Sequence, residues 1–124
     1  MKGIVSDMGN PVMQFQILST APDQTAKFYS TLFGWTVNAD NPLGYREIGT
    51  GSENGIQGGI WPAPQQAANF TQLFMAVDDV KTYVKKAEAL GAKLIIPPTS
   101  LPDGGELAVM HDPQGMSFGI MKVR

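Results

Sequence analysis

The pattern of polar and apolar residues alternates in two stretches, one near the start and one near the middle of the chain. Residues 12–18, VMQFQIL, alternate apolar side chains with glutamines, and residues 70–77, FTQLFMAV, repeat this alternation less strictly. Successive side chains of a β-strand point to opposite faces, so both stretches predict strands with one face toward a helix and one toward a cavity.

A helical pattern follows the first of these strands. Ser19 or Thr20 is expected to cap this helix, Pro22 suits its first turn, and Gly34 suits its end. The apolar side chains at helical spacing, which predict its buried stripe, are Ala26, Phe28, Tyr29, Leu32 and Phe33.

A second helical pattern follows the other strand. Asp78 or Asp79 is expected to cap this helix and Gly91 to end it. Its predicted buried stripe consists of Val80, Tyr83, Val84, Ala87 and Leu90.

Shorter strands are expected after each helix. They are predicted at residues 35–38, 45–49, 56–61, 93–96, 106–111 and 116–123, with loops at 49–55 and 97–105 and a type I turn at 112–115. The element order is therefore strand, helix and three strands, twice. Gln14 and Gln72 are 58 positions apart and Gly59 and Gly119 are 60 apart, which indicates an internal repeat.

Composition narrows the possible functions. The chain has 124 residues, 43% of them hydrophobic and 16% charged, which suits one globular domain. A net charge of −2 without a basic patch argues against nucleic acid as a partner. Cysteine is absent, which excludes disulfides, thiol catalysis and thiolate metal sites. No apolar run predicts a membrane span or a signal peptide, so we expect a cytoplasmic protein.

Four segments together resemble the vicinal oxygen chelate superfamily, also called the glyoxalase, bleomycin-resistance and dioxygenase group. The segments are QFQILSTAPDQTAKFYSTLFGW, QGGIW, FMAVDDV with ALGAK, and MHDPQGMSFGIM, and they cover nearly the whole chain. The resemblance implies an α+β fold in which two βαβββ modules form an open, curled mixed sheet with the helices outside. This is the glyoxalase/bleomycin resistance/dihydroxybiphenyl dioxygenase fold, and members of this size often form homodimers.

We therefore expect residues 1–124 to form a single domain. Module one is placed at about residues 12–61, the connector at 62–69 and module two at about 70–123.

Enzymes of this superfamily hold a divalent metal with four side chains from the first and last strands of the two modules. The resemblance carries these positions to Gln14, Gly59 (or its neighbour Gly58), Gln72 and Gly119. Glycine has no donor side chain, and two neutral amides are weak ligands for a divalent ion. The sequence therefore predicts neither a family-type metal nor another cofactor.

Strand alternation predicts a cavity with amide and aromatic walls. The residues expected to line it and bind a ligand are Gln14, Gln16, Gln57, Gly59, Trp61, Gln72, Phe74 and Gly119. Such walls suit a small flat or amphipathic molecule. The glutamines at 14 and 72 are equally well explained by hydrogen bonds to each other or to water, and the two aromatic residues by core packing.

The first hypothesis is thus a glyoxalase/bleomycin-resistance-like protein that binds a small amphipathic or aromatic molecule without metal. The alternative is an enzyme of the same superfamily, a lyase, isomerase or dioxygenase. It would have an unconventional metal site or would use His111 or Glu47 in acid–base chemistry. A third interpretation is an interaction module whose cavity is filled by its own side chains. No catalytic residue is assigned by the sequence.

Overall fold

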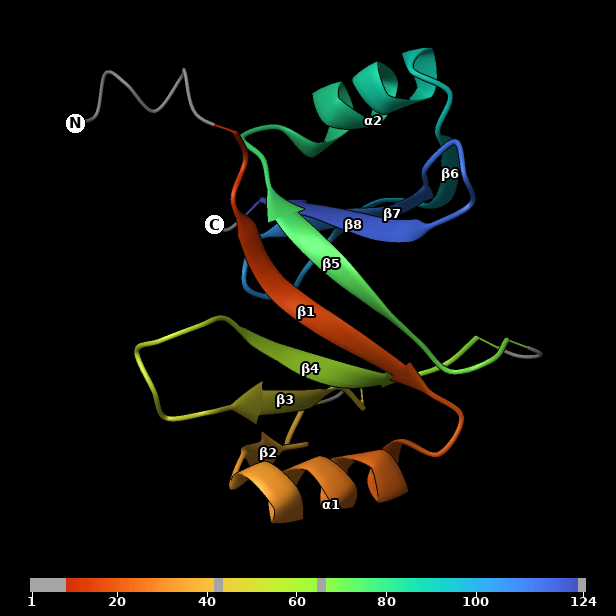
Figure 1. The fold of residues 1–124 in the computed structure, drawn as a ribbon. Coiled ribbons are helices and arrows are strands. Elements are labelled where there is room, and N and C mark those ends of the chain that lie inside the picture. The colour runs from red at the N-terminus through yellow and green to blue at the C-terminus, as the bar shows by residue number, and fades with distance from the viewer. Residues whose placement is uncertain (1–8, 42–43, 65–66, 123–124) are drawn as a thin grey trace. The chain divides into compact units, whose positions relative to one another are not determined.

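The structure is a computed structural model, and it describes residues 9–41, 44–64 and 67–122. Within these residues, two helices and eight strands follow one another in the predicted order (Figure 1). They are β1 (Val12–Ser19), α1 (Pro22–Phe33), β2 (Thr36–Asn38), β3 (Arg46–Gly49), β4 (Gln57–Pro62), β5 (Phe70–Ala76), α2 (Val80–Ala89), β6 (Lys93–Ser100), β7 (Glu106–His111) and β8 (Ser117–Lys122). The predicted α+β class with two βαβββ modules is confirmed.

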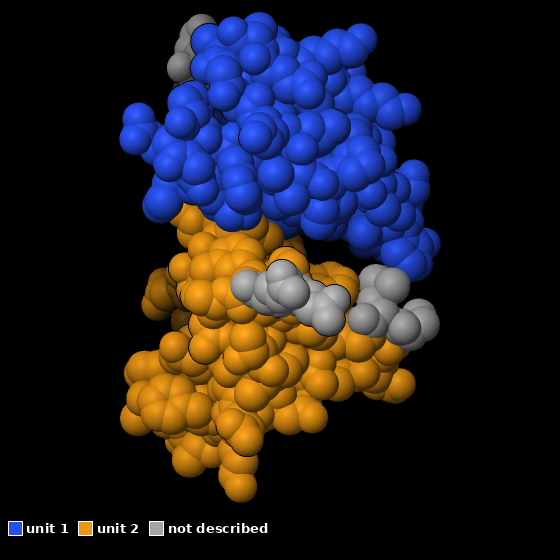
Figure 2. All heavy atoms as spheres, turned by 90° about the vertical axis from the view of Figure 1, so that its right-hand side faces the viewer, with its two compact units in different colours: residues 1–12, 74–124 blue, residues 13–73 orange. Residues whose placement is uncertain are grey.

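The chain divides into two compact units, which Figure 2 colours separately. We call residues 13–73 the N-terminal unit, and residues 74–124 together with residues 1–12 the C-terminal unit. The first residues of β5 belong to the N-terminal unit, so the units do not follow the expected module limits residue by residue. The single domain of 124 residues stays a prediction.

The N-terminal unit is a mixed four-stranded sheet covered on one face by α1. Its strand order is β2-β3-β4-β1, in which β1 and β4 run parallel and the other neighbours antiparallel. Ala26 of α1 packs with the buried Ile48 and Ile60, and Phe15 and Ile17 pack against this cluster. One face of β1 therefore lies against the helix, as the alternation predicts.

The start and end of α1 have separate physical causes. Pro22 is the first helical residue, where its missing N–H costs nothing. The N-cap is Ala21, so the predicted cap at Ser19 or Thr20 is wrong, although the Ser19 hydroxyl accepts a hydrogen bond from the Ala21 N–H at 2.9 Å. Gly34 ends the helix with φ of 72°, a left-handed conformation that glycine adopts without strain.

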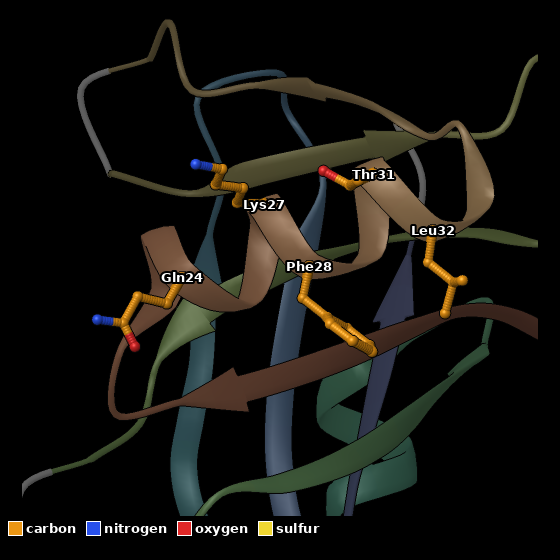
Figure 3. A pocket seen from close by; sticks show the side chains of 5 residues that line it. All are labelled: Gln24, Lys27, Phe28, Thr31 and Leu32. Carbon is orange, nitrogen blue, oxygen red and sulfur yellow. The ribbon is translucent and has the colours of Figure 1, made fainter.

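The outer side of α1 is less buried than its apolar pattern predicts. Phe28, Leu32 and Phe33 are 58%, 59% and 58% exposed, whereas Ala26 is buried and Tyr29 stacks on Trp35 at 5.5 Å. Phe28 and Leu32 are the apolar part of a shallow hollow of 580 Å³ (Figure 3). The residues that line this hollow are Gln24, Lys27, Phe28, Thr31 and Leu32. The predicted stripe is too wide because the small sheet contacts only one side of the helix.

The C-terminal unit is a second mixed sheet with the strand order β5-β8-β7-β6 and α2 against it. Val80 and Val84 of α2 pack with the buried Ala108, Met110 and Ile120. Asp79 is the N-cap, one of the two predicted residues. Leu90 was expected in the buried stripe but is 80% exposed, because it lies beyond the last helical turn as the C-cap.

Strand β6 is longer than the sequence predicts. It continues through Pro97 and Pro98 to Ser100, where a loop was expected. β6 pairs only with β7 in this unit, and its register shifts between Leu94 and Ile96 and again between Ile96 and Thr99. Prolines are tolerated on such an edge strand because their missing N–H need not join a ladder.

The turn between β7 and β8 forms as predicted. The Gly115 N–H donates to the Asp112 carbonyl at 2.8 Å, and the Asp112 carboxylate accepts from Gln114 and Met116. The end of the predicted hairpin at residue 123 lies outside the described residues.

Neither helix of the described residues combines the length and hydrophobicity needed to cross a membrane.

Candidate functional site

The candidate site is the face of the N-terminal sheet that points away from α1. Parallel pairing of β1 with β4 sets Gln14 opposite Gln57, Gln16 opposite Gly59, and Leu18 opposite Trp61. The intervening residues of both strands pack toward α1. Five of the expected cavity residues therefore lie on neighbouring strand positions of one sheet face.

Gln16 and Gln72 form a buried amide pair within this unit. The Gln72 Nε2 donates a hydrogen bond to the Gln16 Oε1 at 3.1 Å, and the two residues are only 6% and 4% exposed. A hydrogen bond between glutamines was one expected alternative, with Gln14 as the partner of Gln72; the bond to a glutamine exists, and its partner is Gln16. A buried amide needs such partners, so this pair fixes the polar part of the face.

The side chain of Gln57 forms hydrogen bonds to Thr50. Its Oε1 accepts the Thr50 N–H at 2.7 Å, and its Nε2 donates to the Thr50 hydroxyl at 3.1 Å. These two bonds close the glycine-rich loop between β3 and β4, so the side chain of Gln57 holds this loop.

Tyr45 also lies on this face, although it was not among the predicted cavity residues. Its ring lies over Gly59, so that a Cβ on this glycine would overlap the phenol. The same ring stacks on Trp61, with centroids 4.6 Å apart and planes at 28°. Gly59 was expected to line a ligand cavity, but Tyr45 occupies the space over this glycine.

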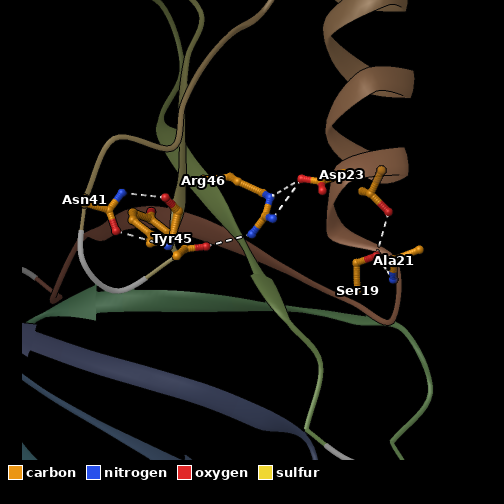
Figure 4. Close-up of polar contacts among 8 residues, drawn as sticks. Ser19, Ala21, Asp23, Asn41, Tyr45 and Arg46 are labelled. Carbon is orange, nitrogen blue, oxygen red and sulfur yellow. Dashed lines mark hydrogen bonds and ion pairs between the residues drawn. The ribbon is translucent and has the colours of Figure 1, made fainter.

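The backbone of Tyr45 is held by one side chain. The amide of Asn41 donates to the Tyr45 carbonyl at 2.6 Å and accepts from the Tyr45 N–H at 3.1 Å (Figure 4). Gly44 takes a positive φ of 72° between them. Asn41 thus fixes the point at which the chain enters β3.

The charges around Tyr45 lie on two faces of the sheet. Arg46 points to the α1 side, where its Nη2 lies 2.8 Å from the Asp23 carboxylate (Figure 4). Glu47 pairs with Gly59 across the strands and so shares the face of Tyr45. Burial, and then the charge of Glu47, raise the pKa of Tyr45 to about 12. The phenol is a neutral hydrogen-bond donor at physiological pH, as an unperturbed tyrosine also is.

In the C-terminal unit, Phe74 and Gly119 are direct partners on β5 and β8. The Phe74 ring lies on Gly119, where a Cβ would overlap it, and the residue is 1% exposed. These two expected cavity residues fit each other closely. His111 is the last residue of β7 and pairs with Ser117 of β8.

The residues at the superfamily's metal positions do not fit a divalent ion. Gly59 and Gly119 offer no donor, and aromatic rings fill the space where ligand side chains would project. The amide of Gln72 is bonded to Gln16. Among the described residues, no three histidine, aspartate or glutamate side chains lie close enough together to hold a metal.

Sequence and structure comparisons agree with this fold. Residues 14–121 match the family described as the glyoxalase-like domain. A Mycobacterium tuberculosis protein named "Putative glyoxylase CFP32" is 29% identical over 122 residues, which are 96% of this chain and 46% of the relative. The anthracycline biosynthesis protein DnrV of Streptomyces peucetius is 24% identical over 125 residues, covering 79% of this chain and 42% of its own length. The chain thus spans about half the length of these relatives.

Solved structures with low sequence identity share the fold. Hypothetical protein BH1468 of Bacillus halodurans C-125 superposes with a TM-score of 0.70 at 13% identity, over 94% of this chain and 96% of that one. Methylmalonyl-CoA epimerase of Mycobacterium tuberculosis gives 0.60 at 16% identity, over 91% and 87%. The chain belongs to the glyoxalase-like domain family, within the vicinal oxygen chelate superfamily that its motifs predict.

Proposed function

We propose that this protein binds a small, flat, amphipathic molecule on the Tyr45–Trp61 face of the N-terminal unit, without the divalent metal of its superfamily. The observation that carries the proposal is the stacked pair of Tyr45 and Trp61 beside the buried Gln16–Gln72 amide pair. Aromatic faces bind flat apolar groups, and a few fixed polar groups orient them. Both aromatic residues are partly exposed, so part of each ring is accessible to a ligand.

The donor chemistry supports a metal-free mode of binding. Two of the four expected ligand positions are glycines covered by rings, and a third is an amide bonded to its neighbour. The phenol of Tyr45 supplies a neutral donor over Gly59, one of the positions to which the resemblance carries a metal ligand of the superfamily's enzymes. Binding and sequestration of a ligand require only that its flat and polar groups match the aromatic rings and the fixed polar groups of this face.

Trp61→Ala is expected to weaken binding of a planar probe at least about tenfold, because the variant loses the aromatic platform. Daunorubicin is a suitable probe, since one relative is named for anthracycline biosynthesis. Isothermal titration of the purified chain measures the affinity. Trp35→Phe is the matched control, because Trp35 packs on the α1 side and should leave binding unchanged. Equal affinity of Trp61→Ala and the parent chain contradicts the site.

We also propose a cytoplasmic homodimer. The absence of cysteine is compatible with a reducing compartment.

Three exposed apolar side chains on the outer side of α1 support the homodimer, because contiguous apolar surface tends to be covered by a partner. Phe28→Asp should then lower the mass measured by light scattering from that of a dimer to that of a monomer. Leu90→Asp is the control, because Leu90 is an exposed leucine on the other unit. A monomeric parent chain refutes the homodimer.

A further inference from the structure

The charges of the N-terminal unit are distributed unevenly between its two faces. Glu47 lies on the face of Tyr45, next to Gly59. The two cations among the described residues of this unit are Lys27, which lines the hollow on α1, and Arg46, which is paired with Asp23. Within the described residues of this unit, the candidate site therefore has a carboxylate beside its phenol and no cation on the same sheet face.

The phenol of Tyr45 is held in place from two sides. Asn41 binds both backbone groups of the residue, and the ring rests on Gly59 and against Trp61. A fixed side chain loses little conformational freedom when a ligand binds. A tyrosine hydroxyl is protonated at neutral pH, and burial and Glu47 raise the pKa of Tyr45 further, to about 12, so this hydroxyl can donate to an acceptor atom.

We infer that the Tyr45–Trp61 face selects planar ligands that are neutral or cationic, through hydrogen bonding to the Tyr45 hydroxyl and attraction to Glu47, and that it rejects planar anions. This inference rests on the proposed function and names its ligand class. Planar compounds that carry a carboxylate, sulfonate or phosphate group are therefore not expected to bind to this face. Each unit of ligand charge is expected to change affinity about threefold, because Glu47 is exposed and partly screened by water.

Two probes with the same three-ring shape and opposite charge test the charge preference. They are 9-aminoacridine, a cation at neutral pH, and anthracene-9-carboxylate, an anion, each titrated into the full chain by fluorescence. We expect the cation to bind about tenfold more tightly at low salt, and the difference to shrink at high salt. Tighter binding of the anion, or equal binding of both, overturns the inference.

Glu47→Gln identifies the residue responsible for the preference. This variant should lose most of the tenfold cation-to-anion ratio. Glu53→Gln, an exposed acid in the loop before β4, should keep the ratio of the parent chain. An unchanged ratio in Glu47→Gln overturns the assignment of the preference to this carboxylate.

Tyr45→Phe separates hydrogen bonding from stacking. Acridone, which is neutral and carries a ring carbonyl, should bind about three- to tenfold more weakly to this variant. Binding of 9-aminoacridine, whose protonated ring nitrogen is no acceptor, should stay the same. Equal loss for both probes overturns the role of the hydroxyl.

The binding measurements on Trp61→Ala distinguish a wrong binding face from a wrong charge preference. If Trp61→Ala binds every probe as tightly as the parent chain, the binding face is wrong and both proposals fall. If Trp61→Ala abolishes binding while charge has no influence, only the selectivity is overturned.

Discussion

Phe74→Ala is expected to lower the free energy of unfolding by about 3–5 kcal/mol, the cost of removing a phenylalanine side chain from a packed core. The residue is 1% exposed and its ring covers Gly119, so truncation leaves a void on β8. Urea denaturation followed by circular dichroism measures the loss. Leu90→Ala, at a position 80% exposed, should change stability by no more than about 0.5 kcal/mol.

The partner substitution turns this result into a test of the contact itself. Gly119→Ala should cost about 1–3 kcal/mol in the parent chain, because the new methyl group overlaps the Phe74 ring. In the Phe74→Ala background the same change should cost far less, since the methyl group then enters the void. Equal costs of Gly119→Ala in both backgrounds contradict this packing.

These effects also limit how Phe74 can be used to probe binding. The sequence suggested Phe74 as a ligand platform, but a side chain buried to this degree supports the fold. A loss of binding in Phe74→Ala would therefore report unfolding as readily as a lost contact, whereas the half-buried Trp61 is the better probe.

Gly58→Ala is expected to destabilise the protein by about 3 kcal/mol or more, which is the upper end of the cost of overpacking. A Cβ at this position would overlap the carbonyl oxygen of Phe15 on the neighbouring strand β1, as well as the Phe15 ring. A side chain can move aside, but this carbonyl belongs to the backbone of the parallel β1–β4 pair. Strand separation or bending is then the only relief.

Gly9→Ala is the matched control for this substitution. A Cβ at Gly9 meets no atom within 4 Å. Thermal and urea unfolding should therefore leave Gly9→Ala within about 0.5 kcal/mol of the parent chain. If Gly58→Ala is as stable as Gly9→Ala, the close approach of β1 and β4 at this position is wrong.

The two glycines of QGGIW illustrate why the site was only partly predictable. Alternation placed Gly59 and Trp61 on one face of their strand, and the pairing of β1 with β4 agrees with this. It did not reveal that Tyr45 fills the space over Gly59. The signal was present, because Tyr45 and Glu47 share one parity. However, the register of β3 on β4 depends on a glycine-rich loop whose closure by Gln57 and Thr50 is a tertiary contact.

Hydrophobic periodicity, helix-ending glycines and the turn at residues 112–115 are local signals, and they were enough to predict the order strand, helix and three strands in both halves. The resemblance of four segments added the superfamily and its βαβββ modules. Which polar and aromatic side chains contact one another became known only from the folded structure. It paired Gln16 with Gln72, set Tyr45 on Gly59, and left Phe28 and Leu32 exposed. It also extended β6 through two prolines, because an edge strand tolerates them. Such outcomes depend on strand register and on which helix side meets the sheet, and neither is encoded within one segment.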